Sequence, residues 1–462
     1  MTRRKTSKKV LALAGMACAA MVAMALPVSS TVTQAAAAEG SSEGMVCTTN
    51  HSTGASDFLL TAKDGYISMP DGNSVYMWGY AAGNGGFQHP GPILCVTEGD
   101  KVTVTLHNTL AVLTSIQFPG QTGVTANGDP AQAQFDASGN LTSLTNAAQP
   151  TQSVTYQFTA SKPGSFIYES GTDEALQVQM GLFGTIVVKP DATTLVGVPA
   201  GAAYGYDTVA GITHTAVSNT VYNAANENML MLSEVDPDLH LAAEQAKGAS
   251  FNSSDYTKPY HARYFLINGR SFPDTVAPNG AAWLPTQPYG ALARVKPYDA
   301  AINPLPAMLH YAGFGISTYP FHPHSNHEKV IGIDGRPLMD GATDLSSEKF
   351  AVVVNPGQTQ DATFVWTNIE DYNSATNAVP VTPPRELNIK QGDLFSGTPY
   401  LGEQGIINQG INTKDECGEY YHVAHSHDLT QSTNYGISFG GMLTLIRVDP
   451  ASGKSVTGVN CG

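Results

Sequence analysis

The stretch Tyr319-Pro-Phe-His-Pro-His-Ser-Asn-His327 and its counterpart His422-Val-Ala-His-Ser-His-Asp428 each contain a His-x-His triplet. In a β-strand, residues i and i+2 point to the same face of the sheet. Two such strands lying side by side would aim four imidazoles at one point, from His322, His324, His425 and His427. Because imidazole suits zinc, copper, nickel and iron, the pattern predicts a metal site on a β-sheet. The alternative is a hydrogen-bonded histidine cluster.

The rest of the chain also favours strands. Short β-branched and aromatic runs recur between Gly, Pro, Asn and Asp clusters, as in sandwiches and barrels. Lys101-Val-Thr-Val-Thr-Leu-His-Asn108 alternates as a half-buried strand does, and one helix is expected near Leu239 to Lys247. We predict an all-β chain with two antiparallel domains. Their expected limits are 45–192 and 226–450, with a Gly/Ala-rich linker at 193–225 and a tail at 451–462.

The N-terminus has the pattern of a secretory signal peptide. Basic residues gather between Arg3 and Lys9, Val10 to Leu26 is almost wholly apolar, and small residues end at Ala38. The apolar run is about 17 residues, which is short for a membrane span. We therefore expect removal of residues 1–38, no membrane span, and a secreted, periplasmic or cell-envelope location. Arg3-Arg4 and Cys18 leave a twin-arginine signal and a lipoprotein signal as alternatives.

Charge and cysteine content bear on the binding partners and on the disulfide bonds of the chain. Of 23 basic residues, five lie in the signal, so 18 remain against 38 acidic residues. Such a surface repels nucleic acid and anionic membranes. An even number of cysteines in an oxidising compartment indicates disulfides. Three pairings are open to the four mature cysteines, and we favour Cys47–Cys95 with Cys417–Cys461.

Several stretches together resemble the multicopper oxidase family, whose members are built from cupredoxin domains. Pro320-Phe-His-Pro-His324 resembles the family's His-Pro-x-His-x-His motif. His425-Ser-His427, followed by Gly441-Met442, resembles its His-Cys-His motif with the trailing Gly-Met. Pro92 to Asp100 resembles the opening strand of the family's first domain. The resemblance implies two cupredoxin-like Greek-key β-sandwich domains and copper as the cofactor.

The departures from the family pattern are as informative as the match. In the family, a mononuclear copper held by Cys, two His and often Met accepts electrons, and eight further histidines hold a trinuclear cluster that reduces dioxygen. Here Ser426 stands at the cysteine position and Tyr319 at the first histidine, while Met442 keeps the axial position. A hydroxyl cannot replace a thiolate in that soft site. The first-domain motifs read Gln117-Phe-Pro-Gly120 and Glu169-Ser-Gly171, so four cluster histidines are absent.

The resemblance leaves His322, His324, His425 and His427 as the metal ligands. Four further residues are candidates near them: Glu169, His327, His422 and Asp428. Glu169 falls at a position where the family has a metal ligand. His327 and His422 are either extra ligands or residues that hydrogen-bond at the rim of the site. Asp428 would orient the imidazole of a ligand through its second ring nitrogen. Two-domain relatives often form homotrimers, which would bring Glu169 to the histidines of a neighbouring subunit. An intramolecular contact in a monomer is the alternative.

Four histidines are too few for a trinuclear cluster, so one or two metal ions are expected. No catalytic residue is identified. The favoured function is a copper-dependent oxidoreductase that acts outside the cytoplasm on a small-molecule substrate or dioxygen. The second is a non-enzymatic copper-binding or structural cell-envelope module. The third is a zinc hydrolase that uses Glu169 as its base.

Overall fold

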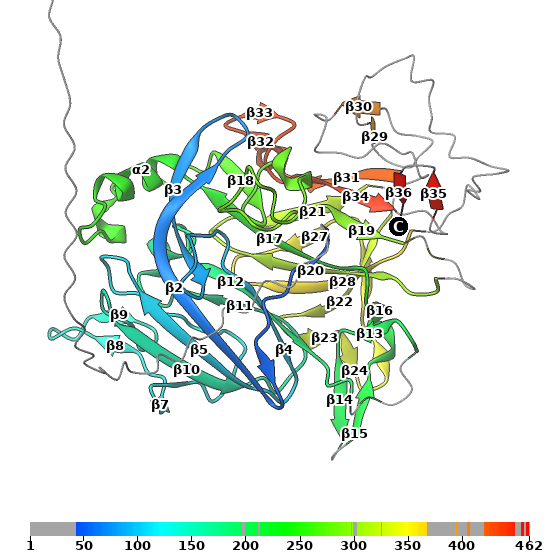
Figure 1. Ribbon diagram of the computed structural model, residues 1–462, viewed down its shortest axis with the longest axis horizontal. Helices are drawn as coiled ribbons and strands as arrows, with labels where there is room; N and C mark the ends of the chain where they lie inside the picture. Colours follow the sequence, from blue (N-terminus) through cyan, green and yellow to red (C-terminus); the bar gives the residue numbers. More distant parts are fainter. Residues whose placement is uncertain are drawn as a thin grey trace, which may run out of the picture. The chain divides into compact units, whose positions relative to one another are not determined.

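A computed structural model of the chain describes residues 43–448, apart from 194, 196–198, 211–212, 297, 299–302, 325, 367–392, 396–403 and 407–419, together with strands at 454–456 and 459–461. The predicted signal peptide lies outside these residues. Strands dominate the described part of the chain (Figure 1). None of the described helices has both the length and the hydropathy that crossing a bilayer requires.

The strands between His51 and Lys189 form two sheets, here called the N-terminal sandwich. The larger sheet has the order β1 (His51–Ser52), β2 (Ala55–Ser68), β5 (Lys101–Asn108), β10 (Ser153–Thr159), β6 (Thr125–Ala126) and β7 (Asp129–Pro130), with β3 (Ser74–Ala82) on β2. The smaller sheet has the order β11 (Gly164–Glu169), β12 (Phe183–Lys189) and β4 (Ile93–Thr97). Alternate residues of β5 and β10 are buried, because one face of each strand packs on the core between the sheets.

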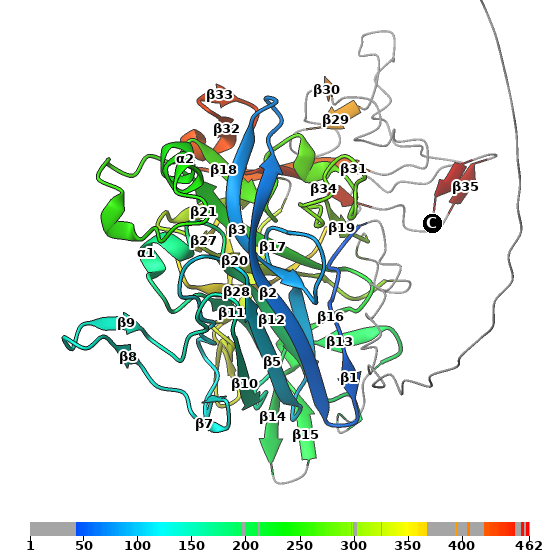
Figure 2. The ribbon, with the colours of Figure 1, turned by 60° about the vertical axis from the view of Figure 1, so that its left-hand side comes forward.

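The strands between Glu227 and Val448 form the C-terminal sandwich (Figure 2). Its larger sheet has the order β23 (Arg336–Pro337), β22 (Glu328–Ile333), β28 (Thr359–Phe364), β20 (Ala307–Gly313), β17 (Glu227–Val235), β18 (Tyr264–Ile267), β32 (Thr433–Asn434) and β33 (Ile437–Ser438), with β26 (Ser347–Lys349) on β22. Its smaller sheet has the order β19 (Ala293–Val295), β34 (Leu443–Val448), β31 (Tyr420–Ser426), β21 (Tyr319–Pro323) and β27 (Val352–Val354). Side chains from both sheets share one core.

The sheets are mixed, so the prediction of purely antiparallel domains is wrong. The pairs β2–β5, β4–β12, β17–β20 and β19–β34 are parallel. Each joins strands that are not consecutive in the chain, because the connections between them cross from one sheet to the other. The remaining small strands pair locally: β8 (Gln134–Phe135) with β9 (Leu141–Ser143), β24 (Met339–Asp340) with β25 (Thr343–Asp344), β29 (Asp393–Phe395) with β30 (Gln404–Ile406), and β35 (Lys454–Val456) with β36 (Val459–Cys461).

Two helices and one disulfide complete the framework. α1 is a single turn (Glu174–Gln177), and α2 (Pro237–Gln245) begins two residues before the predicted helix. It starts there because the Asp236 carboxylate accepts the first free N–H groups and Pro237 suits the first helical turn. The predicted Cys47–Cys95 disulfide is confirmed. The second predicted pairing involves Cys417, which lies outside the described residues.

The segment predicted to be a linker carries structure of its own. It contains β13 (Ala202–Tyr204), β14 (Asp207–Ala210), β15 (Thr213–Ala216), a 3-10 turn (Ser218–Thr220) and β16 (Val221–Asn223). β13 pairs with β16, and β14 pairs with β15 as a hairpin. The Tyr206 ring is fully buried, and its hydroxyl donates to Asp361 of the C-terminal sandwich. This Gly/Ala-rich segment therefore contains paired strands and a buried side chain as well as turns.

A buried charged cluster joins the two sandwiches. His310 of β20 lies between two carboxylates, with Nδ1 2.7 Å from Asp361 and Nε2 3.1 Å from Glu227. From the N-terminal sandwich, the Ser165 hydroxyl donates to Asp361 and the Lys189 ammonium pairs with Glu227. Burial alone would lower the pKa of His310, but the two carboxylates raise it to about 9. The imidazole is therefore a buried cation between two anions at neutral pH.

We expect His310→Gln to lower the free energy of unfolding by about 3–5 kcal/mol, because it leaves buried Asp361 without a cation and Glu227 with Lys189 alone. The pKa of His310 is higher in the folded chain (about 9) than in the unfolded chain (about 6.5). Its stabilisation is therefore fully present below about pH 6.5 and is lost as the pH rises through about 9. Denaturant unfolding of both proteins across this range measures the difference. A difference that stays constant with pH would contradict a protonated His310. The exposed His261→Gln is the control, with an expected change within about 0.5 kcal/mol.

Candidate metal centre

The two His-x-His stretches lie on neighbouring antiparallel strands, as their spacing predicts. β21 and β31 pair with His322 directly opposite His425. The pairing continues past both strand ends, because the His324 N–H donates to Val423 and the His427 N–H donates to Pro320. Alternation then places the imidazoles on one face, while Phe321, Ala424 and Ser426 point to the buried face. The sheet thus brings four histidines from two distant stretches together.

The four rings are close enough to share bound metal. The Nε2 atoms of His324 and His425 are 3.1 Å apart. The other ring centroids are separated by 4.9 Å (His322–His324), 5.3 Å (His322–His427) and 5.6 Å (His425–His427). Among the described residues, no three of these histidines bring ring nitrogens all within 4.8 Å of one another. One ion held by more than two of them therefore requires the rings to turn, whereas two ions can use the rings in pairs.

Backbone carbonyls determine which ring nitrogen of His322 and of His425 is free to bind a metal. His322 Nδ1 lies 2.6 Å from the Phe350 carbonyl, and His425 Nδ1 lies 2.8 Å from the Ser426 carbonyl. A carbonyl accepts only from a protonated nitrogen, so both rings carry their proton on Nδ1 and keep a lone pair on Nε2. Hydrogen bonds of this kind orient metal-binding histidines in proteins. The Phe350 ring also stacks on His322, with centroids 3.9 Å apart. The strand spacing gives no signal for Phe350.

The surroundings favour the neutral form of His322, His324 and His425. Burial, together with the neighbouring imidazoles, lowers the pKa of His324 to about 4. Burial also lowers the pKa values of His322 and His425. Neutral imidazole is the form that binds metals, so the four residues fit an ion that prefers nitrogen ligands, such as copper or zinc. The 3.1 Å between two Nε2 atoms is close to the about 3.3 Å expected for two nitrogens bound to one tetrahedral ion.

Three of the other predicted residues have different surroundings. His327 is exposed at the rim, with its ring 6.4 Å from Phe350. His422 lies on the opposite face of β31, fully buried and 6.0 Å from the Trp366 ring, so the strand does not bring it to the other histidines. The Asp428 carboxylate accepts from the Thr430 N–H and hydroxyl, which caps a 3-10 turn (Leu429–Ser432). Asp428 therefore contacts a backbone turn and not an imidazole.

Glu169 lies in the N-terminal sandwich at the end of β11. Gln117, also in a first-domain motif, donates to Glu169 over 3.3 Å, and burial raises the pKa of Glu169 to about 7. Gln117 also lines a pocket of about 220 Å³ with Phe118, Pro119 and Gly120. No contact between Glu169 and the four histidines occurs within the described part of this chain. The stretches Gln117–Gly120 and Glu169–Gly171 therefore contact each other through Gln117 and Glu169.

The positions that correspond to a mononuclear copper site form a hydrogen-bonded core. The Ser426 hydroxyl donates to the Gln431 side chain over 2.6 Å, and Gln431 donates to the Thr318 carbonyl over 3.0 Å. The Tyr319 hydroxyl donates to the buried Glu234 carboxylate. Met442 is fully buried among apolar side chains. Each polar group here therefore has a protein partner.

Comparison with known proteins identifies this architecture. The sequence model of a family described as multicopper oxidase matches residues 61–193. The match lies within the N-terminal sandwich and covers less than a third of the chain, so this part of the chain is similar to multicopper oxidases. A solved structure, the multicopper oxidase mgLAC, aligns with 85% of this chain and 86% of its own at 18% identity and a TM-score of 0.50. At that identity the likeness shows the fold, and it confirms the predicted all-β, cupredoxin-like fold.

Two curated proteins are more similar to this chain in sequence than mgLAC is, but over shorter regions. A probable nitrite reductase-hydroxylamine oxidoreductase fusion protein of Kuenenia stuttgartiensis is 32% identical over 148 residues, which is 28% of this chain and 16% of that protein. Laccase 1 of Metarhizium acridum is 33% identical over 106 residues, which is 22% of this chain and 15% of that protein. The chain therefore aligns with only about one sixth of the length of these two curated relatives.

The hydrogen-bonded core at Ser426 makes a testable prediction. We expect Ser426→Ala to lower the free energy of unfolding by about 1–3 kcal/mol, because the buried Gln431 carbonyl loses its donor. Denaturant unfolding measures this, with the exposed Ser438→Ala as the control. If Ser426→Ala left stability unchanged but removed bound copper, Ser426 would be a ligand and not a core hydroxyl.

Proposed function

We propose that this chain is an exported copper-dependent oxidoreductase with a reduced, mono- or dinuclear copper site at His322, His324, His425 and His427. The observation that carries the proposal is the approach of His324 Nε2 and His425 Nε2 to 3.1 Å, from two strands whose register aligns both His-x-His stretches. The match of residues 61–193 to a multicopper oxidase family model supports copper as the metal and oxidation-reduction as the kind of chemistry. Copper, when bound, supplies one-electron redox chemistry.

The proposed function does not include a mononuclear electron-accepting copper. Ser426 and Tyr319 replace its strongest ligands, and their hydroxyls are committed to Gln431 and Glu234. Substrate would therefore have to reach the histidine site directly. The positions of His427 and Phe350 support this route, because both side chains are exposed to solvent, Phe350 by 55%. An open approach to the metal is what a small-molecule substrate or dioxygen needs.

The same hydrogen-bonded core supports a second candidate, a copper-binding module without catalytic activity. Such a module needs the four imidazoles but no route for electrons. The two candidates predict the same metal content and differ only in whether the bound metal changes oxidation state with a substrate. Redox turnover therefore separates them.

The experiment measures copper content by mass spectrometry and the EPR spectrum of copper-reconstituted chain. We expect one or two coppers per chain, with spectra free of the signature of a mononuclear thiolate site. His322→Ala/His425→Ala should lose at least about tenfold in copper affinity, because it removes directly opposed ligands. His261→Ala is the matched control, since His261 is an exposed histidine away from the site.

Copper content that is unchanged in the double variant would refute the site. If the metal is bound as expected, the next measurement is oxygen uptake with a panel of phenolic, metal-ion and nitrite substrates. Turnover that disappears in the double variant supports the oxidoreductase. Bound copper that none of the substrates reduces would leave the copper-binding module.

We further propose that the chain is exported and assembles as a homotrimer. The signal-like residues 1–38 and the Cys47–Cys95 disulfide support export to an oxidising compartment. The separation of Glu169 and Gln117 from the histidines supports assembly, because a neighbouring subunit would be needed to bring the two motif sets together. The pocket beside Gln117 offers room for side chains of such a neighbour.

One preparation of the exported protein tests both ideas. Intact-mass spectrometry should find a chain that begins near residue 39 and retains the Cys47–Cys95 bond, and light scattering should give three times the chain mass. A chain that keeps residues 1–38 would contradict export through a cleaved signal. A monomeric mass at micromolar concentration would contradict the trimer and leave Glu169 without access to the histidines.

A further inference from the structure

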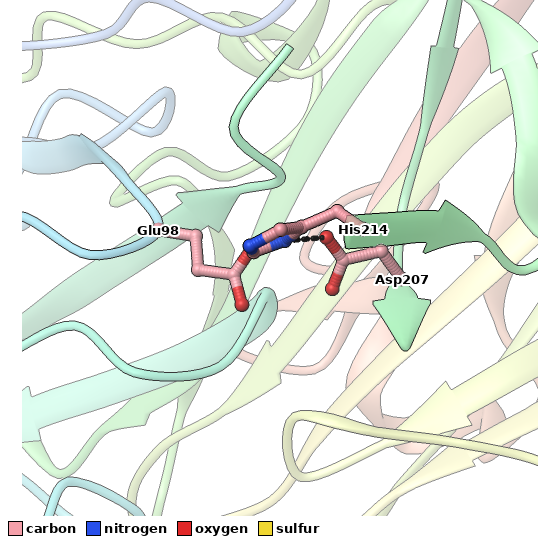
Figure 3. A group of neighbouring side chains, drawn as sticks. All are labelled: Glu98, Asp207 and His214. Atoms are coloured by element: carbon pink, nitrogen blue, oxygen red, sulfur yellow. Dashed lines mark hydrogen bonds and ion pairs between the residues drawn. The ribbon is translucent and has the colours of Figure 1, made fainter. Parts of the chain in front are cut away.

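A second cluster of ligand-type side chains lies far from the four histidines in sequence and fold. Among the described residues, Glu98, Asp207 and His214 are the group of three whose ligand atoms all lie within 4.8 Å of one another. Figure 3 shows the carboxylates of Glu98 and Asp207 on either side of the His214 ring. His214 Nδ1 is 2.8 Å from Asp207 Oδ2 and 3.0 Å from Glu98 Oε2. One nitrogen and two carboxylate oxygens therefore converge on one point.

Hydrogen bonds do not satisfy this arrangement. A ring nitrogen carries at most one proton, and the Nδ1 proton of His214 is directed to Asp207. Asp207 Oδ1 has no hydrogen-bond partner, and Glu98 Oε2 faces only the His214 nitrogen whose proton is directed to Asp207, although both oxygens are buried. The side chains of Glu98 and Asp207 are only 5% and 1% exposed. Unpaired carboxylate oxygens in such an environment are costly, because they have lost water without gaining a donor.

The charge of the cluster is also uncompensated. His214 is the only basic side chain that pairs with either carboxylate within the described part of the chain. One imidazolium leaves a net charge of about −1 for the three groups, and a neutral ring leaves about −2. The cluster therefore favours gain of a positive charge, from protons or from a cation.

We propose that Glu98, Asp207 and His214 form a second metal site, which takes a divalent transition-metal ion of the zinc type. Carboxylate and imidazole together suit such ions, whereas calcium and magnesium prefer oxygen ligands alone. An ion at the point of convergence would replace the single proton and contact all three ligand atoms. The observed 2.8 Å and 3.0 Å separations lie within a few tenths of an ångström of the about 2.9–3.3 Å expected between ligands of one zinc-sized ion.

The position of the cluster indicates what the ion would do. Glu98 lies in the turn between β4 and β5 of the N-terminal sandwich, whereas Asp207 and His214 lie diagonally across the β14–β15 hairpin, two positions out of register. The hairpin belongs to the segment that joins the two sandwiches. An ion held by all three residues would fasten this hairpin to the N-terminal sandwich. This role is independent of the copper chemistry proposed above.

The test uses the full chain with His322, His324, His425 and His427 all replaced by alanine, so that added zinc reports on the second site alone. After removal of metals by chelation, zinc is titrated by calorimetry, and retained zinc is measured by mass spectrometry. We expect about one zinc per chain and a higher melting temperature with zinc than without. Asp207→Asn and Glu98→Gln should each lower the zinc affinity at least about tenfold. Asp57→Asn, an exposed aspartate of β2, is the matched control and should leave it unchanged.

Two outcomes would overturn the proposal. One is the absence of bound zinc in the four-alanine background, which would leave a proton shared between the Glu98 and Asp207 carboxyls. The other is equal zinc affinity in the Asp207→Asn variant. X-ray absorption of the zinc-bound background gives a test that needs no further variant. A shell of one imidazole with oxygen ligands supports the site, and a shell of several imidazoles or of sulfur contradicts it.

Discussion

A protonated imidazole between two buried carboxylates holds the two sandwiches in their relation to each other. His310 contributes the positive charge, and Asp361 and Glu227 accept its two N–H groups. The N-terminal sandwich contributes Ser165 and Lys189 to the same cluster, so neither sandwich satisfies these charges alone. Removing any member would leave a charge in a nearly dry interior. β20, which carries His310, also contacts the histidine-bearing strand through Tyr311 and Phe321.

The candidate metal centre depends on backbone register more than on the histidines themselves. Antiparallel pairing sets His322 opposite His425, and a shift of either strand by one residue would turn that strand's imidazoles into the core. Main-chain carbonyls of Phe350 and Ser426 then hold the rings in the tautomer that leaves Nε2 free. The backbone thus sets the orientation of the imidazole rings, and the side chains supply the nitrogen atoms that would bind the metal. In the second cluster, strand pairing brings only Asp207 and His214 together, and Glu98 joins them through tertiary packing.

Local periodicity explains which features could be predicted. The His-x-His strands follow from a repeat of two residues, and β5 from its alternation. The same repeat places His422 an odd number of residues from His425 and so on the other face, a signal that the sequence interpretation missed. Asp428 followed by Thr430 is likewise a local capping pattern. Phe350 and the Glu98–Asp207 contact bring together residues that are distant in sequence, and no pattern in a single sequence indicates such contacts.

The buried hydrogen bond between Tyr319 and Glu234 has an evolutionary consequence. Glu234 also accepts from the Ile316 N–H and from Gln179, so its carboxylate is built into the surrounding backbone. Changing Tyr319 to histidine would remove one donor from this carboxylate, and changing Ser426 to cysteine would free Gln431. Neither substitution alone could restore a soft copper site, and each would first weaken the core. A chain with both substitutions is therefore separated from the present one by single variants with a weakened core, which makes such a site hard to build one residue at a time.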